Sequence, residues 1–353
     1  MSERYIIPIF VPHLGCPNEC TFCTQRSLSG QMKNITIEEV KEQIEKFLKS
    51  FKNDDIEKEI AFFGGSFTGI DMSLQEDLLK TAYEYIKNGK VSGIRVSTRP
   101  DYIDKERLSL LKKYGVKVIE LGVQSTNDYI LKKCKRGHTF EDVKRASKLI
   151  RRYGFTLGHQ MMVGLPESTR LDELKTAKDL AKLKPKIVRI YPVLVIKNTE
   201  LEKDFKKGVY QPISLLQAVE TSKELCYFFA KKKIKVIRIG LQNTDIITKP
   251  ENLHSEVVAG PYHDAFGQLV EDSIWYDKIL KEVKNFNTKV MEAELEVNPE
   301  DINSVVGHKR ENLGKLKDTY DLKLKIKQND KIKRGNFKLK ILKTYEDMLE
   351  INK

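Results

Sequence analysis

The sequence has no apolar run long enough to cross a membrane, and its first twenty residues lack the basic head and apolar stretch of a secretory signal peptide. It also lacks low-complexity segments and internal repeats beyond an alternation of strand and helix patterns. Hydrophobic residues make up 40% and charged residues 32%, which is an ordinary globular composition. These absences exclude a membrane-spanning protein, and we expect a cytoplasmic protein without a membrane partner.

Cysteine is scarce, with five in 353 residues, yet three of the five lie within eight residues at Cys16, Cys20 and Cys23. In a reducing compartment, clustered cysteines more often bind a metal than form disulfides. A disulfide would also leave the third cysteine without a partner. We therefore predict that these three thiolates converge on one metal centre. Cys134 and Cys226 stand alone in the sequence and are expected to be packing residues.

Acidic residues are outnumbered by basic ones, which gives a net charge of +13. Residues 303–343 contain thirteen Lys or Arg against four Asp or Glu, so the excess is predicted to lie mainly in this tail. A lysine-rich solvated surface explains such a tail without any ligand. Binding of a polyanion explains it equally well, because basic patches bind phosphates without sequence preference.

Strand and helix patterns alternate along the first two thirds of the chain. Residues 5–11 form an apolar, β-branched run that leads into the cysteines, and residues 37–48 have the spacing of an amphipathic helix capped by Thr36 and Glu39. Further strands are predicted at 60–63, 93–97, 116–121, 156–163 and 187–195, with helices between them. Six such strands predict an α/β fold with a parallel sheet. A closed barrel would need eight, so we predict a partial (β/α)6 barrel.

The pattern becomes different after residue 285. A helix at 215–231, a short strand at 234–240 and an irregular segment at 254–275 extend the first domain, which we place at residues 1–285. A strand at 290–297, a helix at 305–320 and two strands within 322–341 then predict a small basic α+β domain at residues 286–353. The loop from Gly307 to Arg310 is weakly similar to the G-x-x-G loop of KH domains, with Arg in the place of the second glycine.

Three thiolates leave one coordination position of the metal centre open. If the metal is zinc, His13 could complete a tetrahedral structural site. If it is an iron–sulfur cluster, one iron remains available for a chelating ligand. The spacing alone leaves both possibilities open.

The C-x3-C-x2-C motif, with Phe22 directly before Cys23 and a strand before the motif, resembles that of the radical S-adenosylmethionine (SAM) superfamily. The resemblance implies a [4Fe-4S] cluster held by Cys16, Cys20 and Cys23, with SAM on the open iron. It also implies an enzyme in which these cofactors generate a 5′-deoxyadenosyl radical, supplied with electrons by a donor such as flavodoxin or ferredoxin. His13 then has no role at the metal.

Glycines and polar residues follow the later strands where that superfamily binds SAM. The resemblance assigns cofactor binding to Gly64, Gly65, Ser97, Arg99, Glu120, Gln124, Arg136 and Gln160. The segments after the third and fourth strands are similar to those of the Elongator catalytic subunit. Arg136 lies twelve residues after Gln124, as does an arginine of anaerobic coproporphyrinogen oxidase that pairs with the cofactor carboxylate. The two parallel N–H groups of a guanidinium suit that role.

The substrate is predicted from more distant resemblance. Residues 254–267 are similar to the Elongator catalytic subunit, whose chemistry modifies the wobble uridine of tRNA. That family has an acetyltransferase domain after its radical domain, for which residues 286–353 leave no room, so we expect a different reaction. Our main hypothesis is a lyase that cleaves a nucleobase, with queuine in queuosine salvage as the substrate and His159 as a catalytic residue beside Gln160. A buried structural role for His159 explains its presence equally well.

Two alternatives stay open. The first is a radical SAM enzyme related to Elongator that modifies a base within tRNA and holds the RNA backbone with its basic tail. The second comes from another class: a zinc-stabilised RNA-binding protein without radical chemistry. The sequence does not indicate the oligomeric state.

Overall fold

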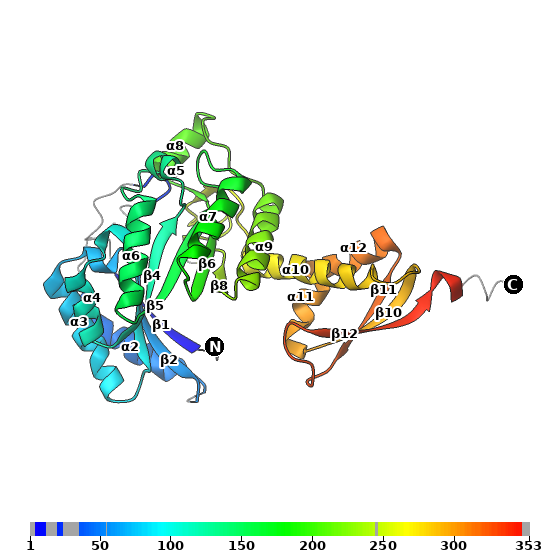
Figure 1. Cartoon of the computed structure of the whole chain (residues 1–353), viewed down its shortest axis with the longest axis horizontal. Coiled ribbons are helices and arrows are strands. Elements are labelled where there is room, and N and C mark those ends of the chain that lie inside the picture. Colours follow the sequence, from blue (N-terminus) through cyan, green and yellow to red (C-terminus); the bar gives the residue numbers. More distant parts are fainter. Residues whose placement is uncertain (1–3, 12–19, 24–34, 54, 244–245, 348–353) are drawn as a thin grey trace. The chain divides into compact units, whose positions relative to one another are not determined.

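The computed structural model describes residues 4–11, 20–23, 35–53, 55–243 and 246–347. The chain divides into two compact units, one comprising Met1–Ala218 and Leu225–Tyr262 and the other Val219–Glu224 and His263–Lys353 (Figure 1). This division lies before residue 285, where the sequence pattern places the domain boundary. The reason is helix α10 (Phe266–Val283), whose Trp275 and Ile279 are buried in the core of the second unit.

The first unit is built on a curled sheet, visible in Figure 1, whose seven strands pair in parallel. Their order is β1 (Arg4–Val11), β2 (Glu57–Gly64), β3 (Gly93–Thr98), β4 (Val116–Gln124), β5 (Thr156–Val163), β6 (Ile187–Pro192) and β8 (Lys235–Ile239). The predicted α/β partial barrel is therefore confirmed. The short strand predicted at 234–240 joins the same sheet, since β8 pairs in parallel with β6.

The longer described helices that connect the strands of this sheet are α2 (Ile37–Ser50), α3 (Met72–Lys87), α4 (Lys105–Lys113), α6 (Phe140–Arg152), α7 (Arg170–Lys182) and α9 (Leu215–Lys231). Helix α6 illustrates why they form. Thr139 caps its first turn together with Asp142, and Val143, Ala146 and Ile150 repeat at helical spacing on its buried face. Apolar residues of the strands and of these helices form the main core. The polar cavity described below lies on the other face of the sheet.

Several short elements of the first unit lie outside the sequence prediction. They are α5 (Asp128–Lys133), α8 (Glu200–Lys206), β7 (Val195–Ile196) and β9 (Val257–Ala259). Two of them contact the cysteine segment: the Thr21 N–H donates to the Cys134 carbonyl just after α5 at 3.2 Å, and the Leu201 N–H of α8 donates to the Thr21 carbonyl at 2.8 Å. Elements of two to seven residues are too short to leave a periodic signal.

The second unit is a three-stranded sheet packed against helices. Strand β10 (Val290–Val297) is central, parallel to β11 (Lys323–Gln328) and antiparallel to β12 (Phe337–Thr344). The helix predicted at 305–320 is divided into α11 (Ile302–Val306) and α12 (Glu311–Tyr320). The break is at Gly307, whose φ is +77° and where an added Cβ would lie 2.9 Å from the Asn312 backbone nitrogen. The similarity of the following loop to KH domains stays a prediction.

The positive excess predicted for the tail is partly neutralised on the exposed face of this sheet. Strand β10 presents three glutamates on that face, and each has a lysine opposite it on both neighbouring strands. The three sets are Glu292 with Lys323 and Lys343, Glu294 with Lys325 and Lys340, and Glu296 with Lys327 and Lys338. Lysines and carboxylates therefore alternate across the strands. None of the described helices combines the length and the hydropathy that a bilayer span requires.

Candidate active site

A cavity of about 370 Å³ opens where the strands of the first unit end. Carboxyl ends of parallel strands meet at one edge of a sheet, so residues distant in sequence converge there. Ten residues predicted to hold the cluster or the cofactor line the cavity: Cys20, Cys23, Gly64, Gly65, Ser97, Arg99, Glu120, Gln124, Arg136 and Gln160. Cys16, the third predicted cluster ligand, lies outside the described residues.

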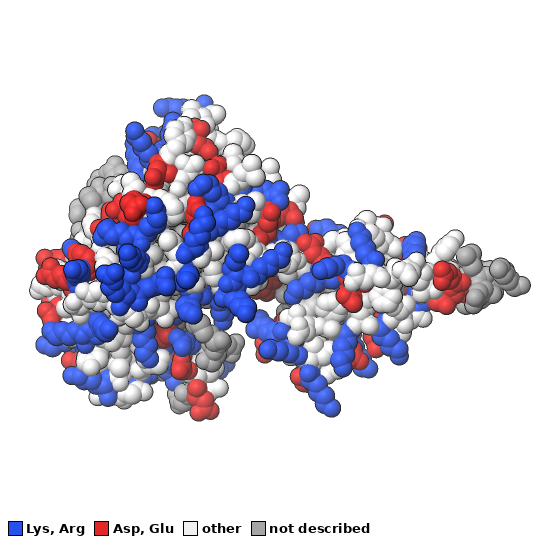
Figure 2. Space-filling view, viewed as in Figure 1, with Lys and Arg blue, Asp and Glu red and all other residues white. Residues whose placement is uncertain are grey.

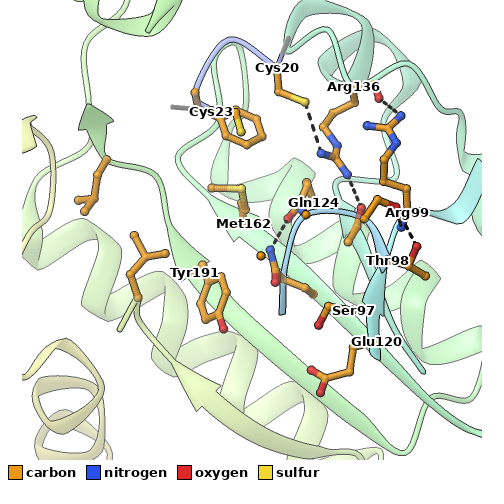
Figure 3. Close-up of a pocket in the computed structure, with 18 of the residues that line it drawn as sticks. Cys20, Cys23, Ser97, Thr98, Arg99, Glu120, Gln124, Arg136, Met162 and Tyr191 are labelled. Atoms are coloured by element: carbon orange, nitrogen blue, oxygen red, sulfur yellow. Dashed lines mark hydrogen bonds between the residues drawn. The ribbon is translucent and has the colours of Figure 1, made fainter. Parts of the chain in front are cut away.

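Two cysteines lie at one end of the cavity, opposite Ser97 and Glu120 (Figure 3). A tight turn brings them together, because the Cys23 N–H donates to the Cys20 carbonyl at 2.9 Å. The Cys20 Sγ is buried and lies 3.4 Å from the Arg136 Nη1. A guanidinium donor at this distance suits a sulfur that carries negative charge, as a metal-bound thiolate does.

Cys134 lies near the cluster cysteines but has different chemistry. Its side chain is fully buried, within a small apolar cluster. Burial raises the pKa of the Cys134 thiol to about 12, and the charge of Cys20 adds to the rise. A thiol with this pKa stays protonated at neutral pH, and metals bind the thiolate form. Cys134 is therefore a packing residue.

Arg136, beside the cavity, has one nitrogen with a hydrogen-bond acceptor and another without one. Its Nη2 donates to the Gly122 carbonyl at 2.7 Å, whereas its buried Nε has no hydrogen-bond partner among the described residues. A buried donor without an acceptor costs free energy. Arg136 also borders the cavity, so a ligand carboxylate there could pair with its guanidinium. The residues present thus fit the carboxylate of SAM, the group that the sequence assigns to Arg136.

Gly122 gives this arrangement its space. A Cβ added at Gly122 would lie 3.1 Å from the Gln124 Nε2, a tight contact, and 3.4 Å from the Arg136 Nη2, so a side chain there would crowd the Gln124 amide. Gln124 has a φ of +69°, in the left-handed region that non-glycine residues rarely adopt. The register of β4 against β5 shifts between Gly122 and Gln124, which marks a bulge that re-aims the side chain. The Gln160 Nε2 then donates to the Gln124 Oε1 at 3.2 Å.

Ser97 and Arg99 lie where β3 ends, and the turn after β2 is tied to this segment. The Ser66 Oγ lies 2.8 Å from the Thr98 Oγ1 and accepts the Arg99 N–H at 3.1 Å. The Arg99 guanidinium donates to Asp101 at 2.9 Å and to the Arg136 carbonyl. Arg99 therefore connects two segments that border the cavity.

Glu120 belongs to a buried row of alternating charges that crosses the inner face of the sheet. It accepts from the Arg95 Nη1 at 3.1 Å and from the Arg189 Nη2 at 3.2 Å. Arg95 also pairs with Glu59 at 2.5 Å, and Glu59 pairs with Arg4. Both oxygens of Glu120 are thus engaged by arginines. A contact of Glu120 with the cofactor stays a prediction, and its visible role is to close the cavity floor.

The placement of His159 contradicts its predicted role. Its side chain is 1% exposed, and its Nε2 lies 2.9 Å from the Ser147 Oγ on α6, on the helix side of the sheet. Successive residues of a strand point to opposite faces, so Gln160 and Met162 line the cavity and His159 does not. Burial lowers the pKa of His159 to about 3, which keeps it neutral. The prediction of a catalytic His159 is wrong, and the structural alternative matches its surroundings.

Sequence reasoning missed several apolar residues of the cavity. Met162 and Tyr191 lie near its centre in Figure 3 and form part of its wall. The alternation of β5 could have found Met162, since it is two residues after Gln160. Leu241 and Ile247 come from the irregular segment after β8, which carries no such pattern.

Comparison with known proteins assigns the chain to a family. Residues 10–180 match the Radical SAM superfamily, and residues 185–276 match the Radical SAM C-terminal domain. An uncharacterized protein of Methanocaldococcus jannaschii is 31% identical over 222 residues, which are 60% of this chain and 68% of that protein. The chain belongs to the radical SAM superfamily. Enzymes of this superfamily use a [4Fe-4S] cluster and SAM, and these are the cofactors of this radical SAM enzyme.

Other relatives of this radical SAM enzyme match over a smaller share of their own length. The tRNA uridine(34) acetyltransferase of M. jannaschii is 31% identical over 182 residues, which are 46% of this chain and 34% of that enzyme. Elongator complex protein 3 of Homo sapiens is 32% identical over 146 residues, which are 39% of this chain and 27% of that protein. The chain thus matches about a third of these proteins. Among solved structures, archaeal Elp3 of Methanocaldococcus infernus has the same fold, with a TM-score of 0.62 at 24% identity over 80% of this chain and 64% of that one.

Proposed function

We propose that this radical SAM enzyme modifies a base within tRNA. The observation that carries the proposal is the convergence, in one cavity, of Cys20 and Cys23 with the polar residues that the sequence assigns to SAM. The tRNA substrate is supported by relatives named tRNA uridine(34) acetyltransferase. Because the chain matches about a third of their length, their acetyltransferase activity is not part of the proposal.

The same findings favour the tRNA alternative over the queuine lyase of the main hypothesis. The lyase hypothesis relied on His159 to contact the diol of the substrate or to move a proton. His159 lies on the helix side of the sheet, so it does neither. The zinc alternative had assigned the cysteines to a structural metal, and membership of the superfamily replaces that assignment.

In this proposal the residues of the cavity bind and orient. Cys16, Cys20 and Cys23 hold the cluster, and Arg136, which lines the cavity, pairs its guanidinium with the SAM carboxylate. Gln124 and Gln160 fix each other in the wall between the two ends of the cavity. When bound, the cofactors supply a 5′-deoxyadenosyl radical that abstracts hydrogen. The one electron that this requires comes from a donor such as flavodoxin or ferredoxin.

The shape of the cavity limits what enters it. The cluster and SAM take up much of this cavity of about 370 Å³, so a tRNA would bring one base to it while the rest of the RNA stays outside. Met162, Tyr191, Ile196 and Ile247 provide apolar surface for a planar ring. The same side chains exclude water from the site, which protects a radical from side reactions.

The experiment that tests this function measures 5′-deoxyadenosine. The enzyme is reconstituted anaerobically with iron and sulfide, reduced, and incubated with SAM and either an unmodified tRNA transcript or queuine. We expect the transcript to stimulate release of 5′-deoxyadenosine and queuine to leave it at the level without substrate. Stimulation by queuine and not by tRNA would contradict the proposal and restore the lyase hypothesis.

A further inference from the structure

Four turns at the edge of the sheet opposite the cavity carry an unusual concentration of cations. They lead from α4 to β4, from α6 to β5, from α7 to β6 and from α9 to β8, and β4, β5, β6 and β8 are neighbours in the sheet. We call the set the basic edge. Its members are Lys112, Lys113, Lys117, Lys148, Arg151, Arg152, Lys182, Lys184, Lys186, Lys231, Lys232, Lys233 and Lys235.

The four turns form one continuous surface. The Lys112 Nζ of the first turn donates to the Tyr153 carbonyl of the second at 2.9 Å. The Arg151 Nη1 of the second donates to the Leu183 carbonyl of the third at 3.4 Å. The Lys235 N–H of the fourth donates to the Lys186 carbonyl of the third at 3.1 Å. Cations of separate helices are therefore held side by side.

The charge of the basic edge is largely uncompensated. All of its members are exposed, and the turn segments 112–117, 148–153, 182–186 and 231–235 contain no Asp or Glu. In the part of the chain that the structure describes, carboxylate partners are found for Lys113 (Glu76, 2.8 Å) and Lys182 (Asp179, 2.9 Å). Figure 2 shows Lys and Arg side chains gathered over the face where α6 and α7 lie.

Helix electrostatics explain only part of this set. Cations in the last turn of a helix interact favourably with its dipole, which accounts for residues such as Arg151, Arg152 and Lys182. It does not account for Lys184, Lys186 and Lys235, which lie beyond the helix ends.

Backbone conformation gives a second argument. The first two turns reverse through Gly115 and Gly154, with φ of +72° and +85°. The last two turns reverse through Lys184 and Lys233, with φ of +55° and +56°. Glycine is the favoured residue in this left-handed position after a helix, and a lysine there is conformationally unfavourable. Two of the four turns thus carry a cation where the backbone favours glycine.

We propose that the basic edge binds the phosphate backbone of RNA. A continuous row of cations, most of them without a carboxylate partner among the described residues, suits phosphates. The inference rests on the proposed function and narrows its substrate class. The eight residues of β5 span about 26 Å from the basic edge to the cavity edge, at roughly 3.3 Å per residue. A folded RNA can reach both edges, and a free nucleobase cannot.

The lysines of the second unit are a poorer site for the same ligand. On the exposed face of that sheet each row of lysines adjoins the glutamates of β10, with ion pairs such as Lys325 to Glu292 at 2.5 Å. A phosphate that approaches a lysine on this face also comes close to a glutamate carboxylate, which repels it. The expected RNA contact is therefore the basic edge, and not the tail that the sequence indicated.

The test uses the full chain and an unmodified tRNA transcript with a fluorescent label, whose binding is followed by anisotropy from about 50 to 300 mM KCl. The variant combines Lys184→Gly, Lys186→Ala, Lys233→Gly and Lys235→Ala. The two glycines suit the left-handed positions, so the urea midpoint of this variant should not fall. With four cations removed, we expect tRNA affinity to fall roughly tenfold or more at low salt, and the slope of log Kd against log salt to decrease by about 3.

A matched control removes four lysines of the second unit through Lys323→Ala, Lys325→Ala, Lys338→Ala and Lys340→Ala, and it should keep nearly the affinity of the unaltered chain. Unchanged tRNA affinity in the first variant, or an equal loss in both, would overturn the proposal. So would loss of binding to phosphatidylserine vesicles with tRNA binding intact, because the surface would then recognise a membrane. The assay needs no cofactor. If tRNA binds through the basic edge but no base is modified, the proposed function fails while this inference stands.

Discussion

Arg136 is the residue on which the cofactor end of the site depends. It is the described residue that contacts a cluster cysteine with one nitrogen and leaves another nitrogen buried without a partner. We predict that Arg136→Gln weakens SAM binding about tenfold or more, because a charge-assisted hydrogen bond of about 1.5–3 kcal/mol is lost. Equilibrium dialysis with the reconstituted enzyme under anaerobic conditions measures this.

The matched control for that prediction is Arg152→Gln, which removes an exposed arginine at the opposite edge of the sheet. Iron content should stay the same in both variants, since Arg136 is not a metal ligand. Unaltered SAM affinity in Arg136→Gln would show that the guanidinium serves the fold and not the cofactor.

His159 provides the opposite case, a residue important for stability and not for chemistry. His159→Gln should lower the free energy of unfolding by about 1–3 kcal/mol, because the hydrogen bond with Ser147 and the fit of a buried ring are disturbed. Release of 5′-deoxyadenosine per cluster should be unchanged. Urea unfolding and product analysis measure the two quantities, and a stable variant without turnover would contradict this account.

Low pH should destabilise the fold through the same residue, His159. Burial lowers the pKa of His159 from 6.5 to about 3, so the folded state holds it neutral while the unfolded chain binds a proton. Its contribution to stability is therefore complete above about pH 6.5 and is lost as the pH falls toward 3. The Gln variant has no titrating group at this position, so its stability should fall less steeply over that range.

At the scale of the element, Glu173 of α7 holds the turn that follows β5. Its Oε1 accepts the Gly164 N–H at 2.6 Å, and burial raises its pKa from 4.5 to about 7. The folded state thus favours the protonated carboxyl. This contribution is complete below pH 4.5 and is lost as the pH rises to 7, by roughly 3 kcal/mol in total.

Glu173→Gln keeps an oxygen acceptor for Gly164 and removes the titration. We predict that the variant gains stability relative to the unaltered chain between pH 5 and pH 8, and urea unfolding at the two pH values measures this gain. The same pH dependence in both proteins would contradict this account, because it would mean that folding leaves the pKa of Glu173 at its ordinary value.

The turns of the basic edge allow a test of how much a lysine in the left-handed position costs in folding stability. Lys184→Gly and Lys233→Gly should each raise the free energy of unfolding by about 0.5–1 kcal/mol, because a left-handed residue other than glycine costs about 1–2 kcal/mol, part of which the greater freedom of an unfolded glycine offsets. The reverse changes, Gly115→Lys and Gly154→Lys, should destabilise the chain. Thermal unfolding compares the four variants, and a loss of stability in the glycine variants would contradict the expectation.

Element prediction from sequence succeeded where a pattern was long and failed where it was short. The helix predicted between the strands at 116–121 and 156–163 has a sustained apolar spacing, and it appears as α6 with its cap at Thr139. Helices α5 and α8 have six and seven residues, so no spacing marks them, although both contact the cysteine segment. His159 was assigned to the wrong face of β5. Neighbouring residues of a strand face opposite sides of the sheet, and the sequence does not show which side meets the cavity.

At the scale of the whole molecule, the site was predictable because parallel strands bring their ends together. Gly64, Gln124 and Gln160 are far apart in the sequence, but Gly64 and Gln124 end their strands and Gln160 lies in the second half of β5. Charge was harder to place. The sequence shows how many lysines the tail has, whereas their partial neutralisation by Glu292, Glu294 and Glu296 depends on a strand order that the sequence does not reveal. The basic edge likewise exists only once β4, β5, β6 and β8 are neighbours.

The central claim is that this chain uses its cluster and SAM to alter a base of tRNA. The most direct measurement is mass spectrometry of the nucleosides of a tRNA transcript after incubation with the reduced, reconstituted enzyme and SAM. We predict a nucleoside of new mass that requires enzyme, reductant and SAM together and is absent with Cys20→Ala. A tRNA with unchanged nucleosides under conditions that release 5′-deoxyadenosine, or a new nucleoside formed equally by Cys20→Ala, would contradict the account.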